Sequence, residues 1–458
     1  MRAAEDHVAD ERLSRRRFAA ASLAGVAVPL AGTARGQEHA VPGTPGGPLA
    51  DYVHAADPAT RFEPLSAGVG HGGRWRTGVL TSQRWRGSAW RHELSLFMPD
   101  RCAACGRMLL WIDGGHADAV PESGGISPPD TVGPLADACH GAGLPGAVVR
   151  QVPWQPMFDG LVEDGLIAHS FAEYVRTGDA TWPLLLPMVK AAVEAMTASA
   201  RVAREAWGVE IDGFVVTGAS KRGWTTWLSA AVDRRVLGIV PMVIDMLSLE
   251  RQIALQRESF GTLSAELDDY TSRGIERLIG SPRGRDLVRI VDPFDYRDAI
   301  VQPKLIALGT NDPYWPLGAL DVYHGALAGP CWVSYAPNTG HDLPAARVCG
   351  LVAAMGRHVT GSEPLPRLVW RSVEETADVL VECDAAPEHV TLWQASSPTM
   401  DFRSATWSPR RLDHRGAGWT IPGMRPPAGF AAAFAEFAFS RDPFPLLLTT
   451  GIRLVRAG

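Results

Sequence analysis

Residues 214–224 read FVVTGASKRGW, which combines an apolar strand, a tight turn and the start of a helix. The turn contains Gly218 and Ser220 in a glycine-x-serine pattern, which can lift a serine hydroxyl above the end of a strand. Gly218 supplies the room that such a close turn requires. The pattern departs from strict G-x-S-x-G, because Arg222 stands at the fifth position and glycine follows only at Gly223. We interpret the stretch as a nucleophile elbow; an ordinary tight turn is the alternative.

Two later loops supply partners for a serine nucleophile. Asp312 and His341 each follow a short apolar run that reads as a buried strand. A serine hydroxyl needs a base to remove its proton, and the base needs an acid to orient it. The order serine, aspartate, histidine along the chain is that of α/β-hydrolases. We therefore predict Ser220 as nucleophile, His341 as base and then acid, and Asp312 as the orienting acid. Asp245, which ends an earlier apolar run, is the alternative acid.

Backbone amides are the predicted binding site for the negative charge that develops on a substrate oxygen. The amide of Lys221 stands at the start of the helix that follows Ser220, which favours this role. A second donor is expected from the Gly-Gly loop that contains Gly115 and His116, although a plain turn remains the alternative. The side chain of Lys221 points away from its neighbour Ser220, so a serine–lysine pair is disfavoured.

The pattern of apolar runs predicts the fold class and the domains. Between residues 51 and 362, strand-like runs alternate with helical stretches, which predicts an α/β-hydrolase-like, mostly parallel sheet. Residues 246–300 read as a polar helical lid inserted into this domain, and residues 363–458 read as a small all-β, sandwich-like domain. The predicted strands are 108–112, 146–152, 213–216, 238–244, 304–308 and 332–335, followed by 368–371, 377–382, 389–393, 431–439 and 446–454.

The N-terminus has the pattern of an export signal. Ser14-Arg15-Arg16-Arg17-Phe18 precedes an alanine-rich apolar run and then small residues at 31–34. Residues 1–36 are therefore predicted to be a twin-arginine signal peptide, with a disordered basic tail as the alternative. Residues 37–50 have linker composition. We expect a periplasmic or secreted protein, and no stretch is long enough for a permanent membrane span.

Composition excludes several function classes. The 458 residues are 46% hydrophobic and 21% charged, which is the usage of a folded globular protein. The formal net charge of −6 and the absence of a later basic block disfavour nucleic acid as a partner. Six cysteines are compatible with disulfides. Cys102 and Cys105 could form half a zinc site, but no second half follows, so a local disulfide or two inert thiols is preferred. We expect no metal and no cofactor.

The sequence resembles the PhoPQ-activated pathogenicity-related family of exported, α/β-hydrolase-like proteins, over nearly its full length after the leader. This resemblance implies the fold and the triad geometry more firmly than it implies a substrate. The sequence departs from the family pattern at Trp154, because asparagine commonly stands at this position in the family. The resemblance is carried by the following stretches: 51–53, 80–83, Trp85, 90–92, 151–153, 155–156, 163–164, 166–168, 217–228, 292–293, 303–304, 311–312, 314–315, 337–338, 340–341, 392–393 and 401–403.

The leading interpretation is an exported serine hydrolase that cleaves an ester or amide, from a small molecule or from the cell envelope, through an acyl-enzyme. Trp154, Trp224, Trp315 and Arg222 are candidate pocket residues and suggest a polar substrate, although core packing explains each tryptophan equally well. A non-catalytic envelope or secreted binding protein on the same fold is the alternative. A glycan-active enzyme built on Asp268 and Asp269 ranks last, because adjacent acids on a polar helix are usually solvated.

Overall fold

The structure is a computed structural model, and it describes residues 28–29, 46–102, 106–122, 130, 132–373, 376–414, 416 and 418–457. The predicted export signal lies outside the described residues except for β1 (Val28–Pro29), and so does the predicted linker as far as residue 45. Cys105 also lies outside them. Helix α1 begins at Pro48, before the predicted start of the folded part.

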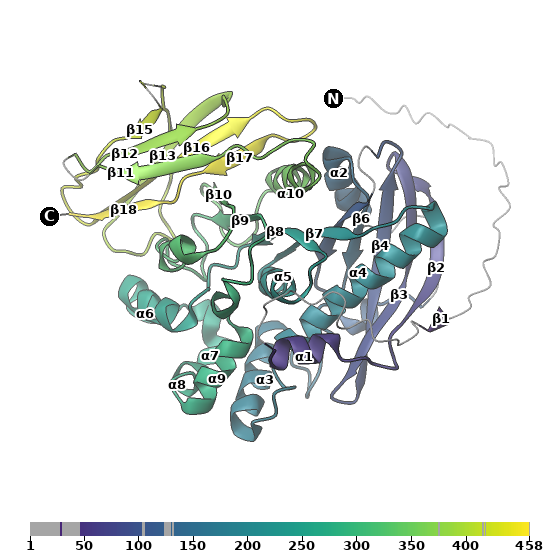
Figure 1. Ribbon diagram of the computed structural model, residues 1–458. Coiled ribbons are helices and arrows are strands. Elements are labelled where there is room, and N and C mark those ends of the chain that lie inside the picture. Colours follow the sequence, from purple (N-terminus) through teal and green to yellow (C-terminus); the bar gives the residue numbers. More distant parts are fainter. Residues whose placement is uncertain are drawn as a thin grey trace, which may run out of the picture.

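A central parallel sheet carries the fold (Figure 1). Its strands, in spatial order, are β6 (Gly146–Val149), β5 (Arg107–Ile112), β7 (Gly213–Ala219), β8 (Val236–Met242), β9 (Lys304–Gly309) and β10 (Cys331–Ala336). These strands are apolar and almost entirely buried, as strands covered on both faces must be. Each coincides with a run predicted from the sequence, so the parallel sheet is confirmed.

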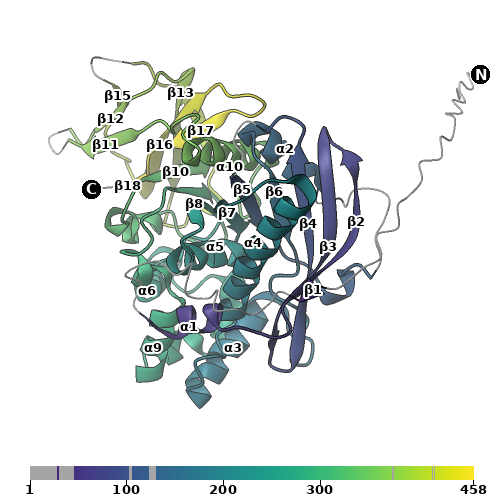
Figure 2. The ribbon, with the colours of Figure 1, turned by 45° about the vertical axis from the view of Figure 1, so that its right-hand side comes forward.

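Three long antiparallel strands extend one edge of this sheet and were not among the predicted strands. They are β2 (Arg61–Gly70), β3 (Gly73–Trp85) and β4 (Ser88–Pro99), and β4 pairs antiparallel with β6. Figure 2 shows them side by side at the edge remote from the C-terminus.

Helices cover both faces of the sheet, and alternate side chains of one strand meet different layers. Leu110 belongs to the core that the sheet shares with α1 (Pro48–His54), α4 (Leu185–Trp207) and α5 (Lys221–Val232) on one face. Leu109 packs with α2 (Val132–Ala142) and α10 (Ala345–Val359) on the other face. The other helical elements of the described residues outside the insertion are α3 (Glu163–Thr177), η1 (Ala117–Ala119), η4 (Leu320–Val322) and η5 (His324–Ala326).

The segment between β8 and β9 is a helical insertion, as predicted, and it packs beside α3 (Figure 1). A strand is absent from its described residues. Its elements are α6 (Leu249–Phe260), η2 (Ala265–Leu267), α7 (Asp268–Thr271), α8 (Ile275–Leu278), α9 (Pro282–Val291) and η3 (Pro293–Tyr296).

The C-terminal part is all-β and has two layers. A separate antiparallel sheet contains β11 (Leu368–Ser372), β12 (Val379–Cys383) and β15 (Trp419–Ile421). The other layer contains β17 (Leu446–Thr449), β16 (Phe430–Phe439), β13 (His389–Ser397), β14 (Ser408–Arg411) and β18 (Arg453–Arg456). Side chains of both layers share one core. This arrangement confirms the predicted fold class.

The C-terminal layer is also continuous with the central sheet. Strand β17 pairs antiparallel with β10, where Val333 lies opposite Thr449. A buried ion pair between Arg347 of α10 and Glu436 of β16 joins the same two parts. In the described part of the chain, the layer with β17, β16, β13, β14 and β18 therefore belongs to the same 15-stranded sheet as the central strands.

Candidate active site

Ser220 stands at the turn between β7 and α5 in a strained backbone conformation. Its φ of 57° and ψ of −124° lie in a region that non-glycine residues rarely adopt. The amide of Ser220 donates a hydrogen bond of 2.8 Å to the carbonyl oxygen of Met242 on β8, which fixes the turn to the sheet. Such strain costs on the order of 1–3 kcal/mol and is characteristic of functional turns.

Two glycines make this turn sterically possible. A Cβ at Gly218 would lie 2.8 Å from backbone atoms of Arg222, and one at Gly223 would lie 2.7 Å from Ile244 and 3.0 Å from the carbonyl oxygen of Gly218. The close approach between strand and helix therefore involves both Gly218 and Gly223. This explains why Arg222 can occupy the fifth position of the motif.

Asp312 and His341 lie in contact at the carboxyl ends of β9 and β10. Nδ1 of His341 is 2.8 Å from Oδ2 of Asp312, and the other carboxylate oxygen accepts a 2.9 Å hydrogen bond from the amide of Tyr314. Asp312 is only 5% exposed. Nε2 of His341 is buried and has no hydrogen-bond partner among the described residues. The aspartate thus holds one ring nitrogen and leaves the other available.

Tyr314 connects this pair to Ser220. Its ring lies on that of His341, with 4.4 Å between the ring centroids and 34° between the planes. Tyr314 and Ser220 line the same cavity. Tyr314 therefore links the Asp312–His341 pair to the cavity of Ser220, although neither Asp312 nor His341 is among the described residues that line it.

Asp245, the alternative acid, has a different partner. It is 4% exposed and accepts a 2.7 Å hydrogen bond from the hydroxyl of Tyr323. Burial raises the pKa of Asp245 to about 8, although the bond from Tyr323 opposes the shift. The contact that orients His341 comes from Asp312.

Lys221 and Arg222, which directly follow Ser220, belong to a cluster of charged residues. Nζ of Lys221 is 2.9 Å from Asp164 and 3.3 Å from Glu163, while Arg222 makes two hydrogen bonds to Glu163, of 2.6 and 2.8 Å. Burial would raise the pKa of Glu163, but the hydrogen bonds and charge of Arg222, the charge of Lys221 and a bond from Gln155 lower it to about 2. The side chain of Lys221 is therefore directed to α3, which leaves its amide as the group nearest Ser220.

The Gly-Gly loop packs against the same cluster. A Cβ at Gly114 would lie 2.5 Å from Nη2 of Arg222, so a larger residue there would require the end of the Arg222 side chain to move. Gly115 has a φ of 135°, and its carbonyl oxygen accepts a 3.3 Å bond from Gln155. Gly115 and His116 are not among the described residues that line the cavity.

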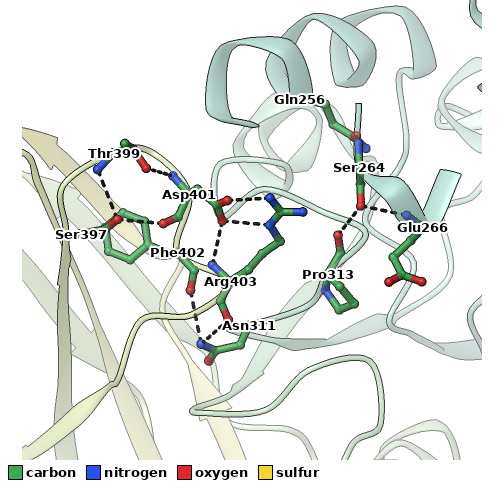
Figure 3. A network of polar contacts seen from close by, with 10 residues as sticks. All are labelled: Gln256, Ser264, Glu266, Asn311, Pro313, Ser397, Thr399, Asp401, Phe402 and Arg403. Carbon is green, nitrogen blue, oxygen red and sulfur yellow. Dashed lines mark hydrogen bonds and ion pairs between the residues drawn. The ribbon is translucent and has the colours of Figure 1, made fainter. Parts of the chain in front are cut away.

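Residues 402–407 of the C-terminal part hold the loops of both Asp312 and His341. Nδ2 of Asn311 donates to the carbonyl oxygens of Phe402 and Arg403 at 3.3 and 3.1 Å (Figure 3). It also donates to that of Ala405 at 2.7 Å. Asn338 exchanges two hydrogen bonds with the backbone of Trp407, of 2.7 and 2.8 Å. We call residues 402–407 the clamp segment. Sequence reasoning assigned no role to either asparagine, because contacts so distant along the chain leave no local pattern.

The helical insertion holds the Asp312 loop from the opposite side. The hydroxyl of Ser264 donates to the carbonyl oxygen of Pro313 at 2.7 Å (Figure 3), and Nε2 of Gln256 donates to that of Tyr314 at 3.0 Å. The loop that carries Asp312 is therefore fixed between the insertion and the clamp segment.

The cavity beside Ser220 lies between the sheet and the insertion. Its volume is about 100 Å³. Trp224 and Trp315, two of the predicted pocket residues, line it. Trp154 packs instead at the edge of the main core, and Arg222 is bound to Glu163.

Other expectations concern metals, membranes and cysteines. Among the described residues, no group of three or more potential ligands could hold a metal ion. No helix in the described part of the chain is long and apolar enough to cross a membrane. Cys139, Cys331, Cys349 and Cys383 are free thiols, while the predicted local pair with Cys105 falls outside the described residues.

Comparison with known proteins identifies the family. Residues 49–403 match the family described as PhoPQ-activated pathogenicity-related protein. The chain belongs to this family. A relative among curated proteins is autocrine proliferation repressor protein A of Dictyostelium discoideum, which is 28% identical over 455 residues, covering 89% of this chain and 90% of that protein.

Solved structures similar to this PhoPQ-related chain include several esterases. Acetyl xylan esterase 1 from Thermoanaerobacterium sp. JW/SL YS485 is 14% identical with a TM-score of 0.45, covering 70% of this chain and 96% of that one. An acetyl xylan esterase from Paenibacillus sp. R4 is 15% identical with a TM-score of 0.41, covering 65% and 89%.

Proposed function

We propose that this protein is a serine hydrolase that cleaves an ester or amide through an acyl-enzyme. The observation that carries the proposal is the Asp312–His341 pair, whose Nε2 is buried and has no partner among the described residues, and which Tyr314 links to the cavity that Ser220 lines. An imidazole nitrogen free to accept a proton beside a serine on a strained turn is the arrangement that general-base catalysis requires.

The proposed reaction has two half-reactions. His341 Nε2 takes the proton of Ser220 as the hydroxyl oxygen attacks the carbonyl carbon, and then gives it to the leaving group as the scissile bond breaks. A water molecule, deprotonated by the same nitrogen, then attacks the acyl-enzyme and releases Ser220. The amide of Lys221, with a second donor from Gly115 or His116, stabilises the oxyanion.

Labelling with a fluorophosphonate probe tests this proposal. The wild-type protein should label at neutral pH, while Ser220→Ala and His341→Ala should lose the label and keep their thermal unfolding transitions. Absence of labelling in folded wild-type protein would refute the proposal.

A non-catalytic signalling or binding protein is the second candidate. It is favoured by the name of the Dictyostelium relative, which describes a repressor of proliferation and no reaction. The same labelling experiment separates the two candidates, since a binding protein needs no activated serine.

Export is part of the proposal and rests on the Ser14–Phe18 pattern. Replacing Arg15, Arg16 and Arg17 by lysine should retain the protein in the cytoplasm. Unchanged export of the triple variant would argue against a twin-arginine route.

A further inference from the structure

The wall of the cavity beside Ser220 is mainly apolar and comes from several elements. Phe171 of α3 and Trp224 of α5 form one side, Ile244 and Met246 follow β8, and Ile253 and Ile275 come from the insertion. Apolar side chains around an open space bind apolar groups, because transfer of such groups out of water is favourable.

The polar groups in this wall are largely engaged within the protein. Asp164 is bound by Tyr270 and Lys221, Trp224 donates its indole N–H to the carbonyl oxygen of Val291, and both ends of the Gln256 amide are bonded. Gln252 donates to two backbone carbonyl oxygens. Among the described lining residues, Oε1 of Gln252, Nε1 of Trp315 and Oε2 of Glu276 are buried without a hydrogen-bond partner. A sugar or peptide in this cavity would lose more hydrogen bonds to water than these few groups could replace.

The placement of the cavity favours the acyl side of a substrate. Ser220 and Lys221 both line it, and the acyl group stays attached to Ser220 through both half-reactions, whereas a leaving group must depart to solvent. A space enclosed by the insertion suits the part of the substrate that stays.

We infer that this cavity binds an apolar acyl chain, so that the preferred substrates are esters of medium-chain fatty acids rather than acetyl esters, sugar esters or peptides. This inference rests on the proposed serine hydrolase function. It replaces the polar substrate expected from the sequence, because Trp224 and Trp315 line an apolar cavity and Arg222 is neutralised by Glu163.

The test compares p-nitrophenyl acetate, butyrate, hexanoate and octanoate on the full chain. The ratio kcat/KM should rise about fourfold per added methylene until the cavity is full, since burying one methylene changes affinity by about that factor. A second series keeps the acetyl group and lengthens the alcohol, and its rates should stay nearly constant. Rates that fall with acyl length, or that rise only with the alcohol, would overturn the inference.

A matched pair of variants on α6 locates the effect. Ile253 lines the cavity, whereas its neighbour Ala254 is exposed. Ile253→Asp should lower the octanoate-to-acetate ratio of kcat/KM at least tenfold, while Ala254→Asp should leave this ratio unchanged. Equal ratios in the two variants would place the acyl chain elsewhere.

Binding without turnover separates this inference from the proposed function. The Ser220→Ala protein should bind octanamide, and should bind acetamide at least a hundredfold more weakly, in calorimetry. Octanamide binding by a protein that neither labels nor cleaves esters would retain the apolar site and refute the hydrolase. Labelling and acetate cleavage without octanamide binding would support the hydrolase and refute the apolar acyl site.

Discussion

The hydroxyl of Tyr270, on the helical insertion, donates a hydrogen bond of 2.8 Å to Asp164 at the start of α3. Asp164 also pairs with Lys221, which follows Ser220 directly. The insertion is thus connected to the elbow by two successive polar contacts. Because the cavity lies between these same elements, its shape depends on this connection.

Tyr270→Phe removes the bond while it keeps the ring. Loss of a buried hydrogen bond to a charged group should reduce the free energy of unfolding by about 1.5–3 kcal/mol. Tyr296→Phe is the control, because Tyr296 on the same insertion donates to the neutral carbonyl oxygen of Ile290. Urea unfolding should show a smaller loss for this control, of about 0.5–1.5 kcal/mol. Equal losses would mean that the hydrogen bond to Asp164 contributes no more stability than the bond to the neutral carbonyl oxygen.

Asp312→Asn should lower kcat on p-nitrophenyl esters by about 10⁴-fold, since an amide cannot hold His341 in the required tautomer. Asp245→Asn should retain most of the activity, because Asp245 contacts Tyr323 instead of the imidazole. Steady-state kinetics of the two folded variants provide the measurement. A larger loss in Asp245→Asn would reverse the assignment of the acid.

Asp245 should make stability depend on pH. Its pKa is about 8 in the folded protein, against 3.8 for an ordinary exposed carboxyl, so the folded state keeps a proton that the unfolded state has lost. The stability that this group contributes is complete below about pH 4, declines as the pH rises, and is lost once the pH passes about 8. Asp245→Asn, which carries no titrating proton, should therefore gain stability relative to wild type between pH 5 and pH 9. If urea unfolding gave a stability difference between variant and wild type that stays constant from pH 5 to pH 9, the prediction would be contradicted.

Asn311→Asp should separate catalysis from stability. The variant keeps the shape of the side chain but loses the N–H groups that bind the clamp segment, so the Asp312 loop should shift. Small misplacements of this kind cost on the order of 10²-fold. We expect kcat to fall by about that factor while KM changes little. Arg403→Ala is the control, because it retains the carbonyl oxygen that Asn311 contacts; a similar fall in both would indicate a general structural effect.

Local patterns in the sequence were sufficient to predict the parallel strands and the contact between Asp312 and His341. Strands β3 and β4 were missed, because buried polar residues interrupt their apolar runs. Ser82, for example, is hidden within β3 and contacts His92 of β4 at 2.9 Å. Period-two patterning fails where polar side chains satisfy one another inside the sheet.

The surroundings of the site could be predicted less well, because long-range contacts determine them. Trp154 and Trp224 look alike in the sequence, yet only Trp224 lines the cavity. Arg222 reads as a substrate-binding cation until Glu163 is placed beside it. The two asparagines contact a segment roughly 70 to 90 positions away, which no local pattern encodes.

The pairing of β17 with β10 means that the C-terminal strands cannot be removed as an independent module. A chain shortened to residue 362 would end the central sheet at β10 with an open edge, where unpaired N–H and C=O groups invite other chains to pair. Such a fragment would also lose the clamp segment that holds Asn311 and Asn338. Truncation should therefore yield aggregated and inactive protein, even though every predicted catalytic residue remains in it.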